Sequence, residues 1–189
     1  MKLDKVLEDF ISLHIKDIDN NDFANCYRDL WWNISASDMS PQDAGVFTKA
    51  MQEADINILD YLNYIPECCY YETDFTGHYL PDHIERIASL AFAKSDIEEI
   101  NCGKGLTRIE SMAFKKCAGL DTVIIYPHPM LTIEGKAFDG CYDLIEIEFR
   151  GTKVEWYKTQ KYDTWANNSG LKYVNCTDGK IQIKKGIKP

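Results

Sequence analysis

The sequence lacks any apolar stretch long enough to cross a membrane. A spanning helix needs roughly 20 consecutive apolar residues, and no stretch of the 189 residues approaches that length. It also lacks an excess of positive charge, because 30 acidic and 21 basic side chains give a formal charge of -9. Affinity for nucleic-acid backbones comes mainly from Lys and Arg that neutralise phosphates. We therefore expect neither a membrane nor a nucleic acid as partner.

The beginning of the chain lacks the pattern of a secretory leader, because MKLDKVLEDF places acidic residues among its apolar ones. The chain has seven cysteines, and an odd number would leave one unpaired in a disulfide-bonded secreted protein. We therefore expect reduced thiols and a cytoplasmic location.

Familiar catalytic motifs are also lacking: the sequence contains no Walker loop, GxGxxG, HExxH or GxSxG. Cys68, Cys69, His78 and His83 supply the donor atoms of a zinc site. Adjacent cysteines chelate one ion awkwardly, so we interpret them as buried thiols beside an ordinary strand, and metal binding there stays open. A cysteine nucleophile with a histidine base has no supporting motif. We predict no enzyme, no cofactor and no metal.

The first third of the chain has helical periodicity, which predicts a helical domain over 1–66. Ser40-Pro41 is a good helix start, followed by apolar residues at helical spacing. A further helical stretch, INILDYLNYI, ends before Pro66. Trp31 and Trp32 are adjacent, so on a helix they point about 100° apart and cannot both face one core. One of them is a candidate anchor for a partner, since Trp is enriched in binding hot spots.

Beyond Pro66 a repeat of 22 to 24 residues replaces the helical pattern. Three segments, which start at Ile84, Thr107 and Leu131, match at their apolar positions. The matching sets are Ile87, Ile109 and Ile133; Phe92, Phe114 and Phe138; Ser95, Cys117 and Cys141; and Ile100, Val123 and Ile147. We expect each copy to be one coil of a solenoid with these side chains inside. The Val-x-Ile end predicts a short parallel strand, and the Ala-Phe pair a helical turn on the opposite side.

The repeat resembles the BspA-like leucine-rich repeat family, whose unit reads roughly I-x-x-I-x-x-x-A-F-x-x-C-x-x-L-x-x-V-x-I-P. The segment 149–181 resembles the C-terminal cap of that family, in which Trp156 and Trp165 would close the last coil. The segment 54–66 resembles the helical lead-in of phage-encoded and related short members. One departure is that Ala88 and Glu110 stand where the family often has a Gly after the entry Ile.

This resemblance implies an α/β solenoid, a short leucine-rich-repeat stack with parallel strands. The expected domains are a helical N-terminal cap domain over 1–66, the repeats over 67–149, and a cap and tail over 150–189. The resemblance also implies an interaction protein without a catalytic centre.

Strand alternation predicts where such a protein would bind. If Ile100, Val123 and Ile147 point inward, their neighbours form two outward columns. We call this surface the acidic strip, and it comprises Tyr79, Glu99, Asn101, Thr122, Ile124, Glu146 and Glu148. It would suit a basic protein partner, although exposed charge also serves solubility alone.

We therefore predict a non-catalytic protein–protein interaction module. The resemblance to phage members extends this to a phage-encoded protein that binds and inhibits a host defence protein in the host cytoplasm. The alternative is a self-associating structural or virion-associated component, so a homo-oligomer stays open.

Overall fold

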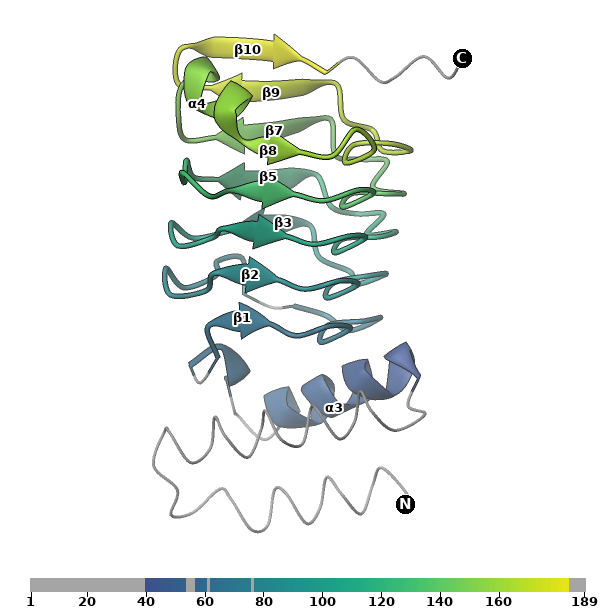
Figure 1. Ribbon diagram of the computed structural model, residues 1–189. Helices are drawn as coiled ribbons and strands as arrows, with labels where there is room; N and C mark the ends of the chain where they lie inside the picture. The colour runs from purple at the N-terminus through teal and green to yellow at the C-terminus, as the bar shows by residue number, and fades with distance from the viewer. Residues whose placement is uncertain (1–39, 54–56, 61, 76, 184–189) are drawn as a thin grey trace.

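The computed structural model describes residues 40–53, 57–60, 62–75 and 77–183, and every structural statement below concerns these residues. A stack of coils rises from one helix, α3 (Pro41–Glu53), which lies across the lower end of the stack (Figure 1). Ser40 caps this helix through Asp43, whose carboxylate accepts hydrogen bonds from the Ser40 backbone N–H and hydroxyl. The helix buries Phe47 and Met51 against the first coil. The predicted helix start at Ser40-Pro41 is confirmed.

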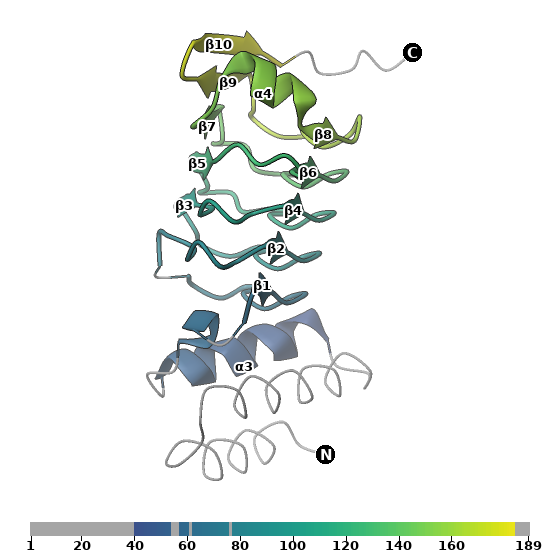
Figure 2. The same cartoon turned by 60° about the vertical axis from the view of Figure 1, so that its left-hand side comes forward.

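Each coil contributes strands to two sheets on opposite sides of the stack (Figure 2). Sheet A is parallel and contains β1 (Tyr64–Ile65), β2 (Arg86–Ile87), β4 (Arg108–Ile109), β6 (Thr132–Ile133) and β8 (Gln160–Lys161). Sheet B contains the parallel strands β3 (Glu99–Asn101), β5 (Thr122–Ile125), β7 (Glu146–Phe149) and β9 (Tyr173–Cys176), and ends with the antiparallel β10 (Gly179–Gln182). The strands predicted from the Val-x-Ile pattern are β3, β5 and β7 of sheet B. The sequence interpretation missed β9, β10 and all of sheet A.

The core consists of columns of identical or similar side chains. Tyr70, Phe92, Phe114 and Phe138 stack face to face with centroid separations of 5.1, 5.2 and 5.3 Å. These distances are close to the strand spacing of about 4.8 Å, so the coil repeat itself sets the ring separation. The repeated Ile, Cys and Leu positions are also fully buried. The prediction that the repeat positions point inward is confirmed.

The segments around the Ala-Phe pairs form successive turns rather than the predicted helical turn. Leu90 and Lys94 in one coil and Met112 and Lys116 in the next have φ between 58° and 60°. Left-handed residues cannot continue a right-handed helix. They turn alternate backbone groups toward the next coil, as when the Lys94 N–H donates to the Lys115 carbonyl at 2.8 Å. These bonds join the coils along the edge between the sheets.

The stack extends beyond the three coils recognised in the sequence. The expected helical stretch before Pro66 is wrong, because Ile58–Asp60 forms one 3-10 turn, η1, and Tyr64–Ile65 is strand β1. The Ala88 N–H donates to the Ile65 carbonyl at 2.9 Å, so pairing with the following coil outweighs local helical preference. At the other end β8 and β9 add a further coil. Where one domain ends and the next begins stays a prediction.

Two tryptophans close the far end of the core, as predicted. Helix α4 (Lys153–Lys158) follows its N-cap residue Thr152, which forms a capping box with Glu155. Trp156 on this helix is buried, with its ring centroid 5.1 Å from Phe149 and 5.7 Å from Trp165. The apolar end of the last coil is therefore covered by large aromatic rings.

Candidate interaction surface

The acidic strip is assembled by the register of sheet B. Glu99 pairs with Thr122 and Thr122 with Glu146, which makes one column. The second column contains Tyr79, Asn101, Ile124 and Glu148 in successive strands. The inward residues between these columns are fully buried. The structure thus brings the seven predicted residues together on one face.

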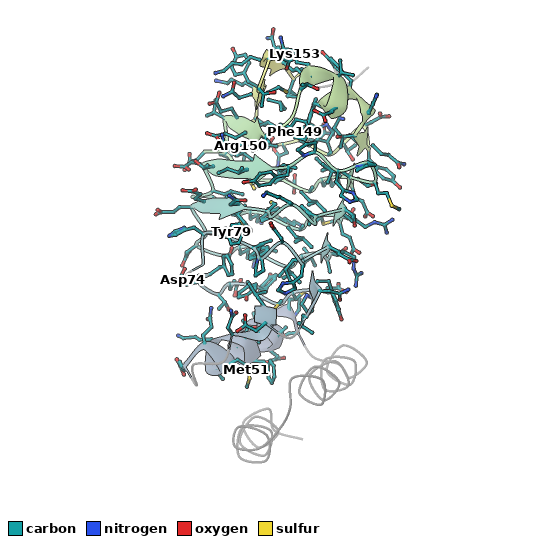
Figure 3. The ribbon with its side chains drawn as sticks, turned by 90° about the vertical axis from the view of Figure 1, so that its left-hand side faces the viewer. Met51, Asp74, Tyr79, Phe149, Arg150 and Lys153 are labelled. Carbon is teal, nitrogen blue, oxygen red and sulfur yellow. The ribbon has the colours of Figure 1, made fainter. Side chains whose placement is uncertain are left out.

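The apolar part of this face differs from the prediction. Ile124 is only 8% exposed, because it lies in the middle of sheet B with Asn101 and Glu148 on the neighbouring strands. Tyr79, at the end of the column, is 50% exposed. In Figure 3, Tyr79 lies lower in the stack than Arg150. Tyr79 is therefore the apolar side chain of the strip that a partner can reach.

Two of the three glutamates in the strip have basic neighbours. Glu146 Oε2 lies 2.6 Å from Lys180 Nζ, and Glu148 Oε2 lies 2.7 Å from Arg150 Nη2. Glu99 is exposed and forms no ion pair within the described part of the chain. The negative charge is therefore concentrated toward β3. Strand alternation could not identify Lys180 as the partner of Glu146, since β10 returns antiparallel after the cap. The pair between Arg150 and Glu148 could have been predicted from the sequence, because Arg150 directly follows β7.

The exposed tyrosine is held in place by neighbours that the sequence did not single out. The Tyr79 hydroxyl donates to Asp82 Oδ1 at 2.9 Å, and the same oxygen accepts from the Lys104 N–H at 2.8 Å. The Lys104 bond, with that of Tyr79, lowers the pKa of Asp82. The hydrogen bond to Asp82 raises the pKa of Tyr79. The ring is thus oriented at the β3 end of the strip, and its phenol is neutral at physiological pH.

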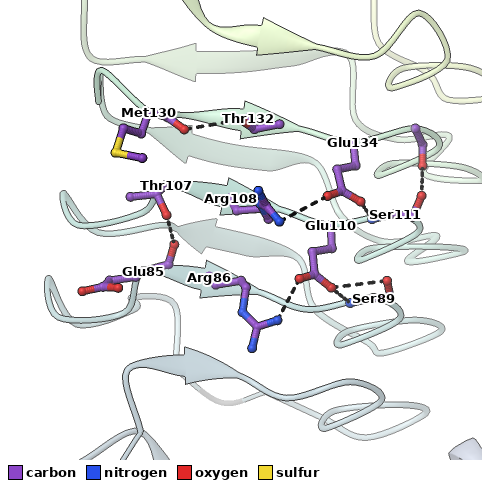
Figure 4. Close-up of polar contacts among 11 residues, drawn as sticks. Glu85, Arg86, Ser89, Thr107, Arg108, Glu110, Ser111, Met130, Thr132 and Glu134 are labelled. Carbon is purple, nitrogen blue, oxygen red and sulfur yellow. Dashed lines mark hydrogen bonds and ion pairs between the residues drawn. The ribbon is translucent and has the colours of Figure 1, made fainter.

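Sheet A carries a different polar pattern, which connects coils (Figure 4). The Glu110 carboxylate accepts from Arg86 Nη1 at 2.9 Å and from the Ser89 N–H at 3.0 Å, both in the preceding coil. Glu134 repeats this one coil later, where it accepts from the Ser111 N–H at 3.1 Å. Each carboxylate therefore satisfies a backbone donor of its neighbour. We assign this ladder to the stability of the stack.

The four residues with zinc-donor atoms are not assembled into a site. Cys69 Sγ lies 3.5 Å from Thr48 Oγ1, His83 Nε2 lies 2.7 Å from the Leu59 carbonyl oxygen, and His78 is exposed. Within the residues that the structure describes, no three His, Cys, Asp or Glu side chains are grouped to hold a metal ion.

Burial suppresses the ionisation of two of the thiols, those of Cys68 and Cys102. Burial raises the pKa of Cys102 to about 12, and burial with the nearby Glu67 raises that of Cys68 to about 11. The thiols of Cys117 and Cys141 donate to the carbonyls of Phe92 and Phe114 at 2.8 and 2.9 Å. Cys117 and Cys141 are fully buried, so they act as small core residues whose thiols satisfy buried carbonyls.

Two further sequence expectations concern other parts of the chain. Trp31 and Trp32 lie outside the described residues. Among the helices within the described ranges, none is long and apolar enough to cross a membrane.

Comparison with known proteins identifies one family whose model matches the stack. The family model described as "BspA type Leucine rich repeat region" matches in six copies, over residues 6–121 and 63–187. A search of curated proteins and a search of solved structures each found no match. The matched ranges include all the strands of both sheets.

Proposed function

Because the chain belongs to the BspA-type leucine-rich repeat family, we propose that it is a non-catalytic protein–protein interaction module whose acidic strip binds a basic protein. Repeat stacks of this kind present extended surfaces to partners. The observation that carries the proposal is the register of sheet B, which gathers the strip on one rigid face.

Glu99 and Tyr79 are the residues that we expect to contribute most to binding. A basic side chain that approaches Glu146 or Glu148 must compete with Lys180 or Arg150, whereas Glu99 has no such competitor among the described residues. Tyrosine is enriched in binding hot spots, and the hydrogen bond of Tyr79 to Asp82 reduces the conformational entropy lost on contact.

The resemblance of segment 54–66 to phage-encoded members is the ground for proposing a phage origin of the chain. In this proposal the chain is made by a phage and inhibits a host defence protein or a host factor that handles nucleic acid. Nucleic-acid-handling proteins carry basic surfaces, and these complement the net charge of -9.

An affinity pull-down from host lysate, read by mass spectrometry, tests the proposal. The baits are the full chain, its Glu99→Lys and Tyr79→Ala variants, and a control with Glu85→Lys, an exposed glutamate that precedes β2 on sheet A. We expect one basic protein to be lost with both strip variants and kept with the control. A partner that all four baits retain would move the site away from the strip, and no partner at all would favour the self-associating alternative.

A further inference from the structure

Sheet B ends in a strand with one open edge. In the order β10-β9-β7-β5-β3, β10 pairs with β9 on one side, and no described strand pairs with its other side. Figure 1 shows β10 at the upper end of the stack. An open edge presents backbone N–H and C=O groups to any strand that can align with it.

The register of the β9–β10 pair shows which backbone groups face outward. Lys180 lies opposite Asn175 and Gln182 opposite Tyr173, and the Ile183 N–H donates to the Lys172 carbonyl at 2.8 Å. In an antiparallel pair, alternate residues direct both backbone groups toward the neighbouring strand. Ile183 directs its backbone groups toward β9, and therefore Ile181 and Gly179 direct theirs toward β9 as well. The N–H and C=O groups of Lys180 and Gln182 must point to the open edge.

The lysine on this edge is held away from it. Lysines on edge strands commonly prevent association, because their charge opposes pairing. Here Lys180 Nζ lies 2.6 Å from Glu146 on β7 and 5.4 Å from the centre of the Tyr173 ring on β9. The side chain thus reaches across the face of the sheet toward its interior. The other outward residue, Gln182, is neutral.

We propose that β10 pairs antiparallel with β10 of a second copy, about a two-fold axis at Ile181. This register places Lys180 of each copy opposite Gln182 of the partner subunit, and the four outward backbone groups of each edge find partners. Moving the axis to Lys180 would place two lysines opposite each other, which is unfavourable. The two Ile181 side chains, each buried on the core side, then meet across the axis. Helix α4, which contacts β10, carries the exposed Val154 and Tyr157 at the same end of the stack (Figure 1).

Charge variants at Gln182 test this register without altering the core. Gln182→Glu creates two Lys–Glu pairs across the axis, and Gln182→Lys creates two Lys–Lys pairs. With two cross-strand pairs per dimer, we expect the dissociation constant to fall about 2- to 30-fold with Glu and to rise by a similar factor with Lys. Analytical ultracentrifugation of the full chain over a wide concentration range measures both.

A backbone variant tests whether the edge itself is used. Gln182→Pro removes an N–H that faces outward, so pairing with β9 is retained while the new pairing is lost. Gln182→Ala is the matched control, because it keeps the N–H. We expect the alanine variant to associate and the proline variant to stay monomeric with an unchanged circular dichroism spectrum.

Several results would overturn the self-pairing. They are a wild-type chain that is monomeric at every concentration, association that Gln182→Pro leaves unchanged, or a strand of a different protein that occupies this edge while the chain itself stays monomeric. Because the edge is separate from the acidic strip's main contacts, Glu99→Lys should leave dimerisation unchanged. The two proposals can therefore fail independently.

Discussion

Glu110 is expected to stabilise the stack through the backbone of the preceding coil more than through its ion pair. Its carboxylate is 17% exposed and lies 3.0 Å from the Ser89 N–H and 2.9 Å from Arg86 Nη1. Replacing Glu110 with Ala leaves the half-buried Ser89 N–H without this acceptor. A hydrogen bond to a charged group contributes about 1.5–3 kcal/mol. An ion pair as exposed as Arg86, at 42%, contributes about 1 kcal/mol or less.

These magnitudes rank four variants by their loss in free energy of unfolding. Glu110→Ala should cost about 2 kcal/mol, and Glu110→Gln about 1 kcal/mol because the amide oxygen still accepts the Ser89 bond. Arg86→Ala should cost about 1 kcal/mol or less. Glu85→Ala, at an exposed carboxylate in the same region, should change stability by less than about 0.5 kcal/mol.

Urea denaturation followed by circular dichroism measures this ranking. With a denaturant slope of about 2 kcal/mol per molar, Glu110→Ala should lower the midpoint by about 1 M. If Glu110→Ala costs no more than Glu110→Gln, the Ser89 hydrogen bond does not carry the interaction and the reasoning is refuted. A Glu110→Ala variant as stable as Glu85→Ala would refute it as well.

Two further predictions concern the turns and the thiols. Gly140 has a φ of +84°, and a Cβ added there would lie 3.2 Å from the Lys116 Cα, so Gly140→Ala should lower the thermal midpoint of unfolding. Gly119→Ala is the control and should leave the midpoint unchanged, because its Cβ would meet nothing closer than 4.0 Å. Burial raises the pKa of Cys68 to about 11 and that of Cys102 to about 12. Iodoacetamide at pH 8 should therefore label both thiols in urea but barely in the native protein, as measured by peptide mass spectrometry. Fast labelling of the native protein would contradict this prediction, because it would show that these thiols open to solvent.

The repeat made most of the core predictable, because burial in a stack follows the same positions in every coil. The spacing alone predicts the column of Phe92, Phe114 and Phe138 and the strands β3, β5 and β7 of sheet B. Sheet A was not predicted, since its two-residue strands are too short for an alternating pattern. The first coil was missed because Tyr64-Ile65 lies in a segment with helical spacing and Tyr70 replaces the repeated Phe.

The geometry of the acidic strip was predictable from alternation, but its charge was not. Register depends on neighbouring strands, which the repeat aligns, so the two columns were placed correctly. The charge depends on Lys180, which reaches Glu146 from a strand outside the repeat. The role of Glu110 also depends on the next coil, since its carboxylate bonds to a backbone group that no sequence pattern marks.

At the upper end of the stack, the apolar core is covered by side chains, but the backbone groups of the last strand of sheet B are not all paired. Trp156 and Trp165 cover the apolar end of the last coil, and Ile181 on β10 is buried with them. The core side chains at that end are thus covered, although Val154 and Tyr157 on α4 stay exposed. Backbone hydrogen bonding at that end is incomplete, because β10 pairs on one side only within the described chain. A cap of this kind protects against loose hydrophobic aggregation while it leaves a short, directional edge for specific pairing. If this edge pairs as proposed, each acidic strip stays exposed and a dimer would present two of them to a partner.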